Sequence, residues 1–185
     1  MKKIIALALA AFLLGGIANA QHHGNCGNCP NHAKHQAAQG RQATECTPQS
    51  KTNADGVDMF VVRAFPTVKS VKNADKWNEV YDSNKKLLGY VVYSKPASDG
   101  IKGYAGETPV MIAFDAKKVI TGVYLLQNQE TPKFVERVEK AGYFDNWNGL
   151  TVKNALKKEV DAVSGATFTS RAVAQSVEAA LKTLK

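Results

Sequence analysis

After its first twenty residues, the 185-residue sequence contains no apolar run long enough to cross a membrane, which takes about 20 residues. It shows no internal repeat, and no Ser-His-Asp triad or paired-carboxylate motif for hydrolysis is recognisable. The four histidines all fall between His22 and His35. Attachment of c-type haem is excluded because Cys26-x-x-Cys29 is followed by Pro30 rather than by His. These absences argue against a hydrolase and leave binding and electron transfer open.

The first twenty residues have the pattern of a secretory signal. Lys2 and Lys3 form a charged start, residues 4–14 are an apolar run, and residues 18–20 (Ala-Asn-Ala) are a small-residue cleavage site. We therefore expect cleavage after Ala20 and export to the periplasm or another extracytoplasmic compartment. Since no Cys follows the cleavage site, a lipoprotein anchor is not expected.

The chain is basic, with a formal net charge of +8. This charge falls to +6 when Lys2 and Lys3 are removed with the signal. A basic chain can indicate nucleic-acid binding, but these lysines are scattered rather than clustered, and export argues against it. We interpret the charge as a solvated basic face that suits an acidic partner or a membrane surface.

Residues 21–56 are predicted to form a tail and linker before the folded part. From residue 32 to 56 the tail has almost no large apolar side chain, which is typical of disorder. Six side chains in the tail could bind Cu or Zn: His22, His23, Cys26, Cys29, His32 and His35. The alternative in an oxidising compartment is a disulfide between Cys26 and Cys29. Cys46 is left over in this scheme, either unpaired or bridging two chains.

The part from residue 57 to 185 has the length of one domain with one core. Its pattern predicts an α+β fold, a twisted antiparallel sheet with flanking helices. Strands are predicted at 87–94, 108–115 and 119–127, and the last two should form a hairpin. Residues 77–82 fit either a short helix or a hairpin arm. One helix is predicted to begin at Thr131-Pro132, and the last to run over 170–185.

Residues 161–170, Asp-Ala-Val-Ser-Gly-Ala-Thr-Phe-Thr-Ser, are the most informative segment. Hydroxyl side chains and a glycine stand there before the predicted last helix. A helix N-terminus leaves unpaired N–H groups and a partial positive charge, which suits a phosphate. Gly165 would let the backbone come close, and Thr169 or Ser170 could cap the helix. The same run is also compatible with an ordinary Ser/Thr-rich helix start that binds nothing.

Five segments, in order, resemble the FMN-binding domain family, which includes the flavin-bearing subunits of sodium-pumping NADH:quinone reductase and of the Rnf electron-transport complex. The segments are 88–91 (Leu-Gly-Tyr-Val), 103–106 (Gly-Tyr-Ala-Gly), 119–123 (Val-Ile-Thr-Gly-Val), 130–132 (Glu-Thr-Pro) and 164–167 (Ser-Gly-Ala-Thr). Each segment is weak alone, but five in the right order are specific.

The resemblance implies a role for each matching residue. In that family the last Thr of the Ser/Thr-Gly-Ala-Thr motif is joined to FMN through a phosphoester, which implies Thr167 here. The bond would be made by an FAD:protein FMN transferase, and Asp161 belongs to the motif that this enzyme reads. The flavin ring would lie against Tyr104, Glu130 and Thr131. The other implied cofactor-binding residues are Ser164, Gly165, Ala166 and Thr169.

The chain departs from the family pattern in two ways. Lys133 stands where the family commonly has Gly, and the membrane helix of the respiratory subunits is missing. The resemblance therefore implies an exported electron carrier with a membrane or extracytoplasmic redox partner, rather than a stand-alone enzyme. The alternative is an extracytoplasmic metal-handling protein that uses the tail, with the folded domain as a scaffold.

Overall fold

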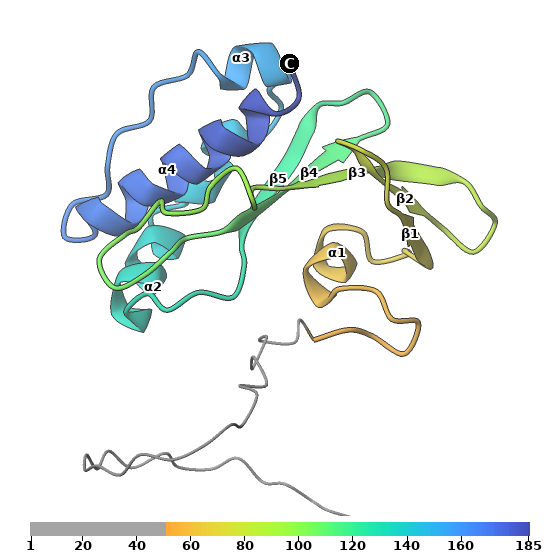
Figure 1. The fold of residues 1–185 in the computed structure, drawn as a ribbon, viewed down its shortest axis with the longest axis horizontal. Coiled ribbons are helices and arrows are strands. Elements are labelled where there is room, and N and C mark those ends of the chain that lie inside the picture. The colour runs from red at the N-terminus through yellow and green to blue at the C-terminus, as the bar shows by residue number, and fades with distance from the viewer. Residues whose placement is uncertain (1–50) are drawn as a thin grey trace, which may run out of the picture. The chain divides into compact units, whose positions relative to one another are not determined.

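The structure is a computed structural model and describes residues 51–185. Five strands form one antiparallel sheet in the order β1-β2-β3-β4-β5 (Figure 1). They are β1 (Ser70–Lys72), β2 (Asn78–Tyr81), β3 (Leu87–Tyr93), β4 (Val110–Asp115) and β5 (Ile120–Leu125). The helices are α1 (Met59–Ala64), α2 (Pro132–Lys140), the 3-10 helix η1 (Tyr143–Trp147), α3 (Val152–Ala155) and α4 (Thr167–Lys182). This architecture confirms the predicted α+β class.

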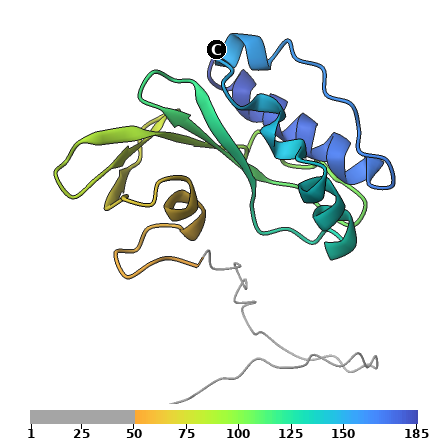
Figure 2. The same ribbon diagram turned by 180° about the vertical axis from the view of Figure 1, so that it is seen from behind.

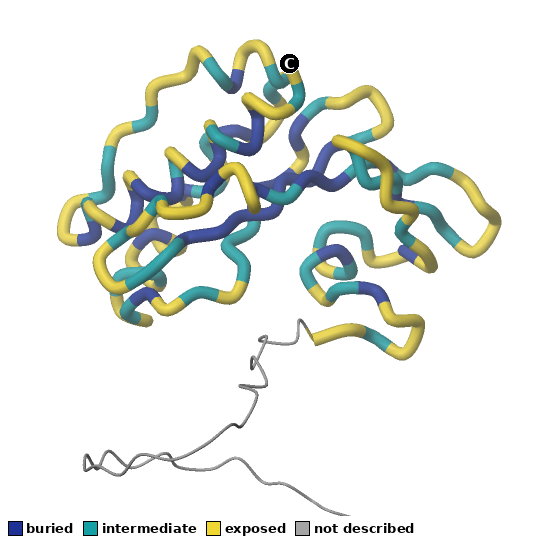
Figure 3. The backbone as a smooth tube through the Cα atoms, in the orientation of Figure 1, coloured by how far each residue is buried: buried dark blue, intermediate teal, exposed yellow. Residues whose placement is uncertain are grey.

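The two faces of the sheet carry separate hydrophobic cores. Ile112 and Phe114 of β4 pack with Val173 of α4 on one face, whereas Met111 packs with Val61 of α1 on the other. Helices α2 and α4 accordingly lie on the opposite side of the sheet from α1 (Figures 1 and 2). Strand β4 is buried on both faces, as its continuous dark trace in Figure 3 shows.

The strand pairing decides between the two interpretations of residues 77–82. Strands β4 and β5 form the predicted hairpin, with Ile112 opposite Val123. Residues 77–82 contain β2, which pairs with β3 through Val80 and Gly89, so the hairpin interpretation is right and the helix interpretation is wrong. Gly89 is required there, because a Cβ at this position would lie 2.1 Å from the carbonyl oxygen of Phe114.

The helix starts differ in how well they were predicted. Helix α2 begins at Pro132 with Thr131 as its N-cap, although the Thr131 side chain makes no capping hydrogen bond. Helix α4 begins at Thr167, three residues before the predicted start, and its N-cap is Ala166. The predicted capping by Thr169 or Ser170 is wrong, because both residues already lie inside the helix.

In the part of the chain that the structure describes, none of the helices combines the length and apolar character that crossing a bilayer requires. The predicted signal at 1–20, the tail up to residue 50 and the six potential metal ligands lie outside the described residues.

Candidate functional site

Thr167 is the first residue of α4 and is half-buried. Its hydroxyl makes one long hydrogen bond, donating to the carbonyl oxygen of Val163 at 3.5 Å. Ser164 and Gly165, just before it, are exposed, as is Asp161. So long a hydrogen bond is weak, and it leaves the hydroxyl of the half-buried Thr167 available for a stronger contact.

Gly165 adopts a backbone conformation that favours glycine, with φ at +73°. Arg137 of α2 packs against it, and its Nη1 donates to the carbonyl oxygen of Gly165 at 3.1 Å. A Cβ on residue 165 would lie 1.9 Å from this nitrogen. The sequence predicted that Gly165 allows a close approach to the backbone, and the group that approaches it here is the guanidinium of Arg137.

The carboxylate of Glu130 joins the glycine loop, residues 103–106, to the first turn of α4. Glu130 is only 6% exposed. Its Oε1 accepts from the backbone N–H of Ala105 at 2.8 Å and of Gly106 at 2.9 Å. Its Oε2 accepts from the hydroxyl of Thr169 at 2.5 Å. Three segments that are far apart in the sequence are thus fixed together by one buried side chain.

The glycine at the start of this loop is a steric requirement. A Cβ on Gly103 would lie 2.7 Å from Oε1 of Glu130, inside van der Waals contact. A side chain at residue 103 would therefore displace the carboxylate that holds the loop.

Burial by itself raises the pKa of the Glu130 carboxyl. The hydrogen bond from Thr169 and those from the backbone N–H groups of Gly106, Ala105 and Tyr104 lower it, and together they hold the pKa below its usual range. Glu130 is therefore a carboxylate at neutral pH, and it acts as an acceptor only.

Two large aromatic side chains are exposed next to these segments. Tyr104 of the glycine loop is 63% exposed, and Phe168 of α4 is 68% exposed. The Tyr104 ring also meets Phe134 of α2 edge to face, with 4.9 Å between centroids. The two exposed rings, on segments that Glu130 joins, offer flat apolar faces on which a ligand ring can stack.

The structure thus brings together most of the residues predicted to bind the cofactor. Glu130 contacts the glycine loop that carries Tyr104, and it also contacts Thr169. Thr131 caps α2 directly after Glu130 and is half-buried, and Lys133 is exposed in the first turn of that helix. Phe168, Phe134 and Arg137 also lie at this surface, although they were not predicted from the sequence. Phe168 lies inside the motif and could have been found there, whereas only the folded chain brings Arg137 to it.

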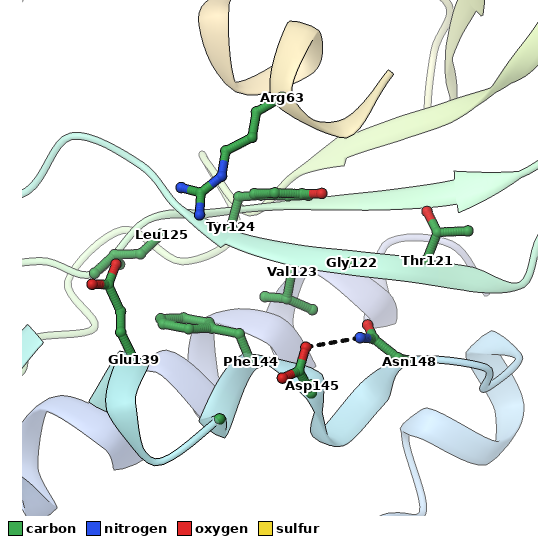
Figure 4. Close-up of a pocket in the computed structure, with 11 residues that line it drawn as sticks. Arg63, Thr121, Gly122, Val123, Tyr124, Leu125, Glu139, Phe144, Asp145 and Asn148 are labelled. Atoms are coloured by element: carbon green, nitrogen blue, oxygen red, sulfur yellow. Dashed lines mark hydrogen bonds between the residues drawn. The ribbon is translucent and has the colours of Figure 1, made fainter. Parts of the chain in front are cut away.

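A separate cavity of about 320 Å³ lies beside β5 and η1. In Figure 4, Arg63 and Tyr124 lie above it, and Glu139 and Phe144 lie below. The Arg63 guanidinium lies 5.7 Å from the centre of the Tyr124 ring. None of the residues predicted to bind the cofactor lines this cavity.

Over residues 51–185, no group of three or more His, Cys, Asp or Glu side chains could hold a metal ion.

The fold is an α+β domain in which the glycine loop and the start of α4 present exposed aromatic side chains. Residues 103–182 match the sequence model of the FMN-binding domain. This match confirms, over residues 103–182, the resemblance to the FMN-binding domain family that the sequence motifs indicated.

Individual relatives agree with this assignment. One component of the Na(+)-translocating ferredoxin:NAD(+) oxidoreductase complex of Acetobacterium woodii is 32% identical over 116 residues, which cover 56% of this chain and 54% of that protein. The corresponding component of the ion-translocating oxidoreductase complex of Aliivibrio fischeri is 32% identical over 90 residues, 43% of each chain. The chain therefore spans about half the length of the curated relatives it matches.

A crystal structure of NqrC from Shewanella oneidensis is similar with a TM-score of 0.41 and 20% identity, covering 72% of this chain and 77% of that one.

The residues of the site fit FMN. Thr167 offers an available hydroxyl at the start of a helix, where a phosphate is favoured. Tyr104 and Phe168 offer exposed rings, and the Arg137 guanidinium lies against the motif.

Proposed function

We propose that this protein is an exported flavoprotein that carries FMN covalently on Thr167 and relays electrons outside the cytoplasm. The available hydroxyl of Thr167, at the start of α4 in the motif segment, is the observation that carries the proposal. Bound FMN supplies transfer of one or two electrons. The protein binds and orients the cofactor, and covalent attachment prevents loss of FMN by dilution after export.

The attachment step needs a second protein and a flavin donor, which are an FAD:protein FMN transferase and FAD. The Oγ of Thr167 forms a bond to the FMN phosphorus, the bond between the two phosphates of FAD breaks, and AMP leaves. The hydroxyl proton passes to the transferase or to solvent. Asp161 is exposed, which is consistent with recognition of the motif by that enzyme.

Each remaining site residue has a role that follows from its position. Tyr104 and Phe168 present rings to a flat ligand. Glu130 holds the glycine loop against α4 and so orients Tyr104 relative to the motif. Thr131 lies next to Glu130, where it can contact the ring, and Ser164 is exposed beside the attachment residue.

We propose that the electron partner is a membrane-associated or extracytoplasmic redox protein. The relatives from Acetobacterium woodii and Aliivibrio fischeri are components of ion-translocating oxidoreductase complexes. The net charge of +6 expected after signal cleavage suits an acidic partner or an anionic membrane surface.

The test is intact mass and peptide mapping of the full chain co-expressed with an active transferase in an exporting host. We expect the mass of the signal-cleaved chain plus FMN minus water, and a flavin-bearing peptide that contains Thr167. An unmodified mass, or a flavin on another residue, would contradict the assignment.

Metal handling by the tail is a second proposal, supported by six potential ligands within the fourteen residues 22–35. Reduced full-length protein should take up Cu or Zn, and a version starting at Asp55 should not while keeping its flavin. Equal metal uptake by the two proteins in calorimetry would exclude a site in the tail.

A further inference from the structure

We infer that Arg137 of α2 is a phosphate-binding residue, whose guanidinium pairs with the FMN phosphate beside Thr167. The inference rests on the proposed function, because it adds a residue to that same site. Arg137 lies 28 residues before Gly165 in the sequence. Only the fold brings the two residues into contact.

The guanidinium of Arg137 is already fixed to the motif segment. Its Nη1 donates to the carbonyl oxygen of Gly165 at 3.1 Å, two residues before Thr167. It also fills the space that a side chain at residue 165 would need, since a Cβ there would lie 1.9 Å from Nη1. The hydrogen bond uses one of the five N–H donors of an arginine.

The charge of Arg137 is not neutralised by another side chain. Across residues 51–185 no carboxylate lies within ion-pair distance of it. Glu136, the acidic neighbour in the chain, pairs instead with Lys140 at 2.6 Å. Glu130 is occupied by the glycine loop and Thr169.

An arginine held in this way suits a phosphate. Its planar fork of N–H donors matches the spacing of phosphate oxygens and forms charge-assisted hydrogen bonds. Arg137 is exposed, so its remaining donors can reach a ligand from solvent. The bond to Gly165 holds the guanidinium against the motif segment, two residues before Thr167, before any ligand arrives, which reduces the entropy lost on binding.

The experiment compares FMN with riboflavin, which lacks only the phosphate. The full-length protein, prepared without transferase and therefore unmodified, is titrated with each ligand by following flavin fluorescence. Wild type is compared with Arg137→Gln, Arg137→Lys, Arg171→Gln and Arg63→Gln. Arg171 lies one turn after Thr167 on α4 and is the competing cation, whereas Arg63 on α1 lines the other cavity and controls for net charge.

We expect wild type to prefer FMN, and Arg137→Gln to weaken FMN binding about tenfold, as loss of a charge-assisted hydrogen bond would. Riboflavin affinity should not change, Arg137→Lys should restore part of the preference, and Arg63→Gln should match wild type. Equal affinity of wild type for the two ligands would overturn the inference. So would full FMN preference in Arg137→Gln, or loss of that preference in Arg171→Gln alone.

The second measurement is the rate of flavin attachment by the transferase at limiting FAD. It tests the inference in the case where neither FMN nor riboflavin binds measurably. Arg137→Gln should then be modified about tenfold more slowly than Arg63→Gln, and equal rates would overturn the inference. An FMN preference that depends on Arg137, in a protein that transferase never modifies, would contradict the covalent proposal and uphold Arg137.

Discussion

The motif surface around Thr167 and the cavity beside β5 each contain an arginine, a glutamate and aromatic rings, yet these groups are arranged differently. At the motif surface Glu130 is buried and accepts hydrogen bonds from the glycine loop and from Thr169, and Arg137 donates to a backbone carbonyl. At the cavity Glu139 is exposed, and Arg63 lies over the Tyr124 ring.

A hollow in the surface is therefore not the same as a preorganised site. The cavity has a volume of about 320 Å³, but no buried polar side chain connects its walls. At the motif surface, a buried carboxylate ties three segments to one another, so their relative positions are fixed before a ligand binds. Preorganisation of this kind lowers the entropy lost on binding.

The sharpest test of this difference is a pair of threonine variants. Thr167→Val should abolish covalent flavin completely, because valine has the shape of threonine but no hydroxyl to attack FAD. Thr121→Val, on β5 at the cavity, should be modified as fully as wild type. The measurement is flavin fluorescence of the denatured protein after electrophoresis, following co-expression with transferase.

The second pair concerns the two glutamates. Glu130→Ala should lower the free energy of unfolding by roughly 1–3 kcal/mol, because it leaves the buried hydroxyl of Thr169 and two N–H groups of the glycine loop without their acceptor. Glu139→Ala, at an exposed position, should stay within about 0.5 kcal/mol of wild type. Urea denaturation followed by tryptophan fluorescence measures both values. Equal losses in the two variants would mean that Glu130 does not hold the site together.

The lowered pKa of Glu130 also predicts that the free energy of unfolding depends on pH. Hydrogen bonds hold its pKa below the usual range in the folded protein, so its ionised form favours folding. Its contribution is complete above the ordinary glutamate pKa of about 4.3 and is lost as the pH falls through the folded value. Wild type should therefore be more stable than Glu130→Gln at pH 7, and the difference should shrink in acid. A difference that stays constant from pH 7 to pH 3 would contradict this account.

Local patterns predicted the family resemblance and three of the five strands, whereas β1 was not predicted. The alternation in 108–115 and 119–127 specified a hairpin, because side chains on a strand point to opposite faces in turn. The ordered motifs indicated an FMN-binding domain in the C-terminal part of the chain, where residues 103–182 match the family. Residues 77–82 stayed ambiguous because the periodicity of so short a segment fits a helix or a strand equally well, and only pairing with β3 decides between them.

The contacts that build the site could not be predicted in the same way. The sequence suggested Glu130 as a residue facing the flavin ring, but not its hydrogen bonds to Ala105 and Thr169, which lie 25 and 39 residues away. Arg137 gave no local signal either. The hydroxyls of Thr169 and Ser170 suggested a helix cap, whereas the fold uses Thr169 to bind Glu130 and Ser170 to accept from the N–H of Val163 at 3.0 Å.

The smallest predicted effect concerns Lys133, which we propose lies near the flavin and raises its potential. Lys133 follows Pro132 in the first turn of α2 and is exposed. A nearby cation stabilises the electrons that the flavin gains, but solvent screening limits this to about 1 kcal/mol at most. For a two-electron couple that energy is about 20 mV.

Lys133→Gly and Lys133→Gln should both lower the midpoint potential of the flavin-loaded protein by about this amount. The glutamine variant separates the loss of charge from the helix-weakening effect of glycine. Lys117→Gln, in the turn between β4 and β5, removes the same charge elsewhere and should leave the potential unchanged. Spectroelectrochemical titration of the four proteins decides the matter, and a potential that follows net charge alone would show that Lys133 has no special position beside the ring.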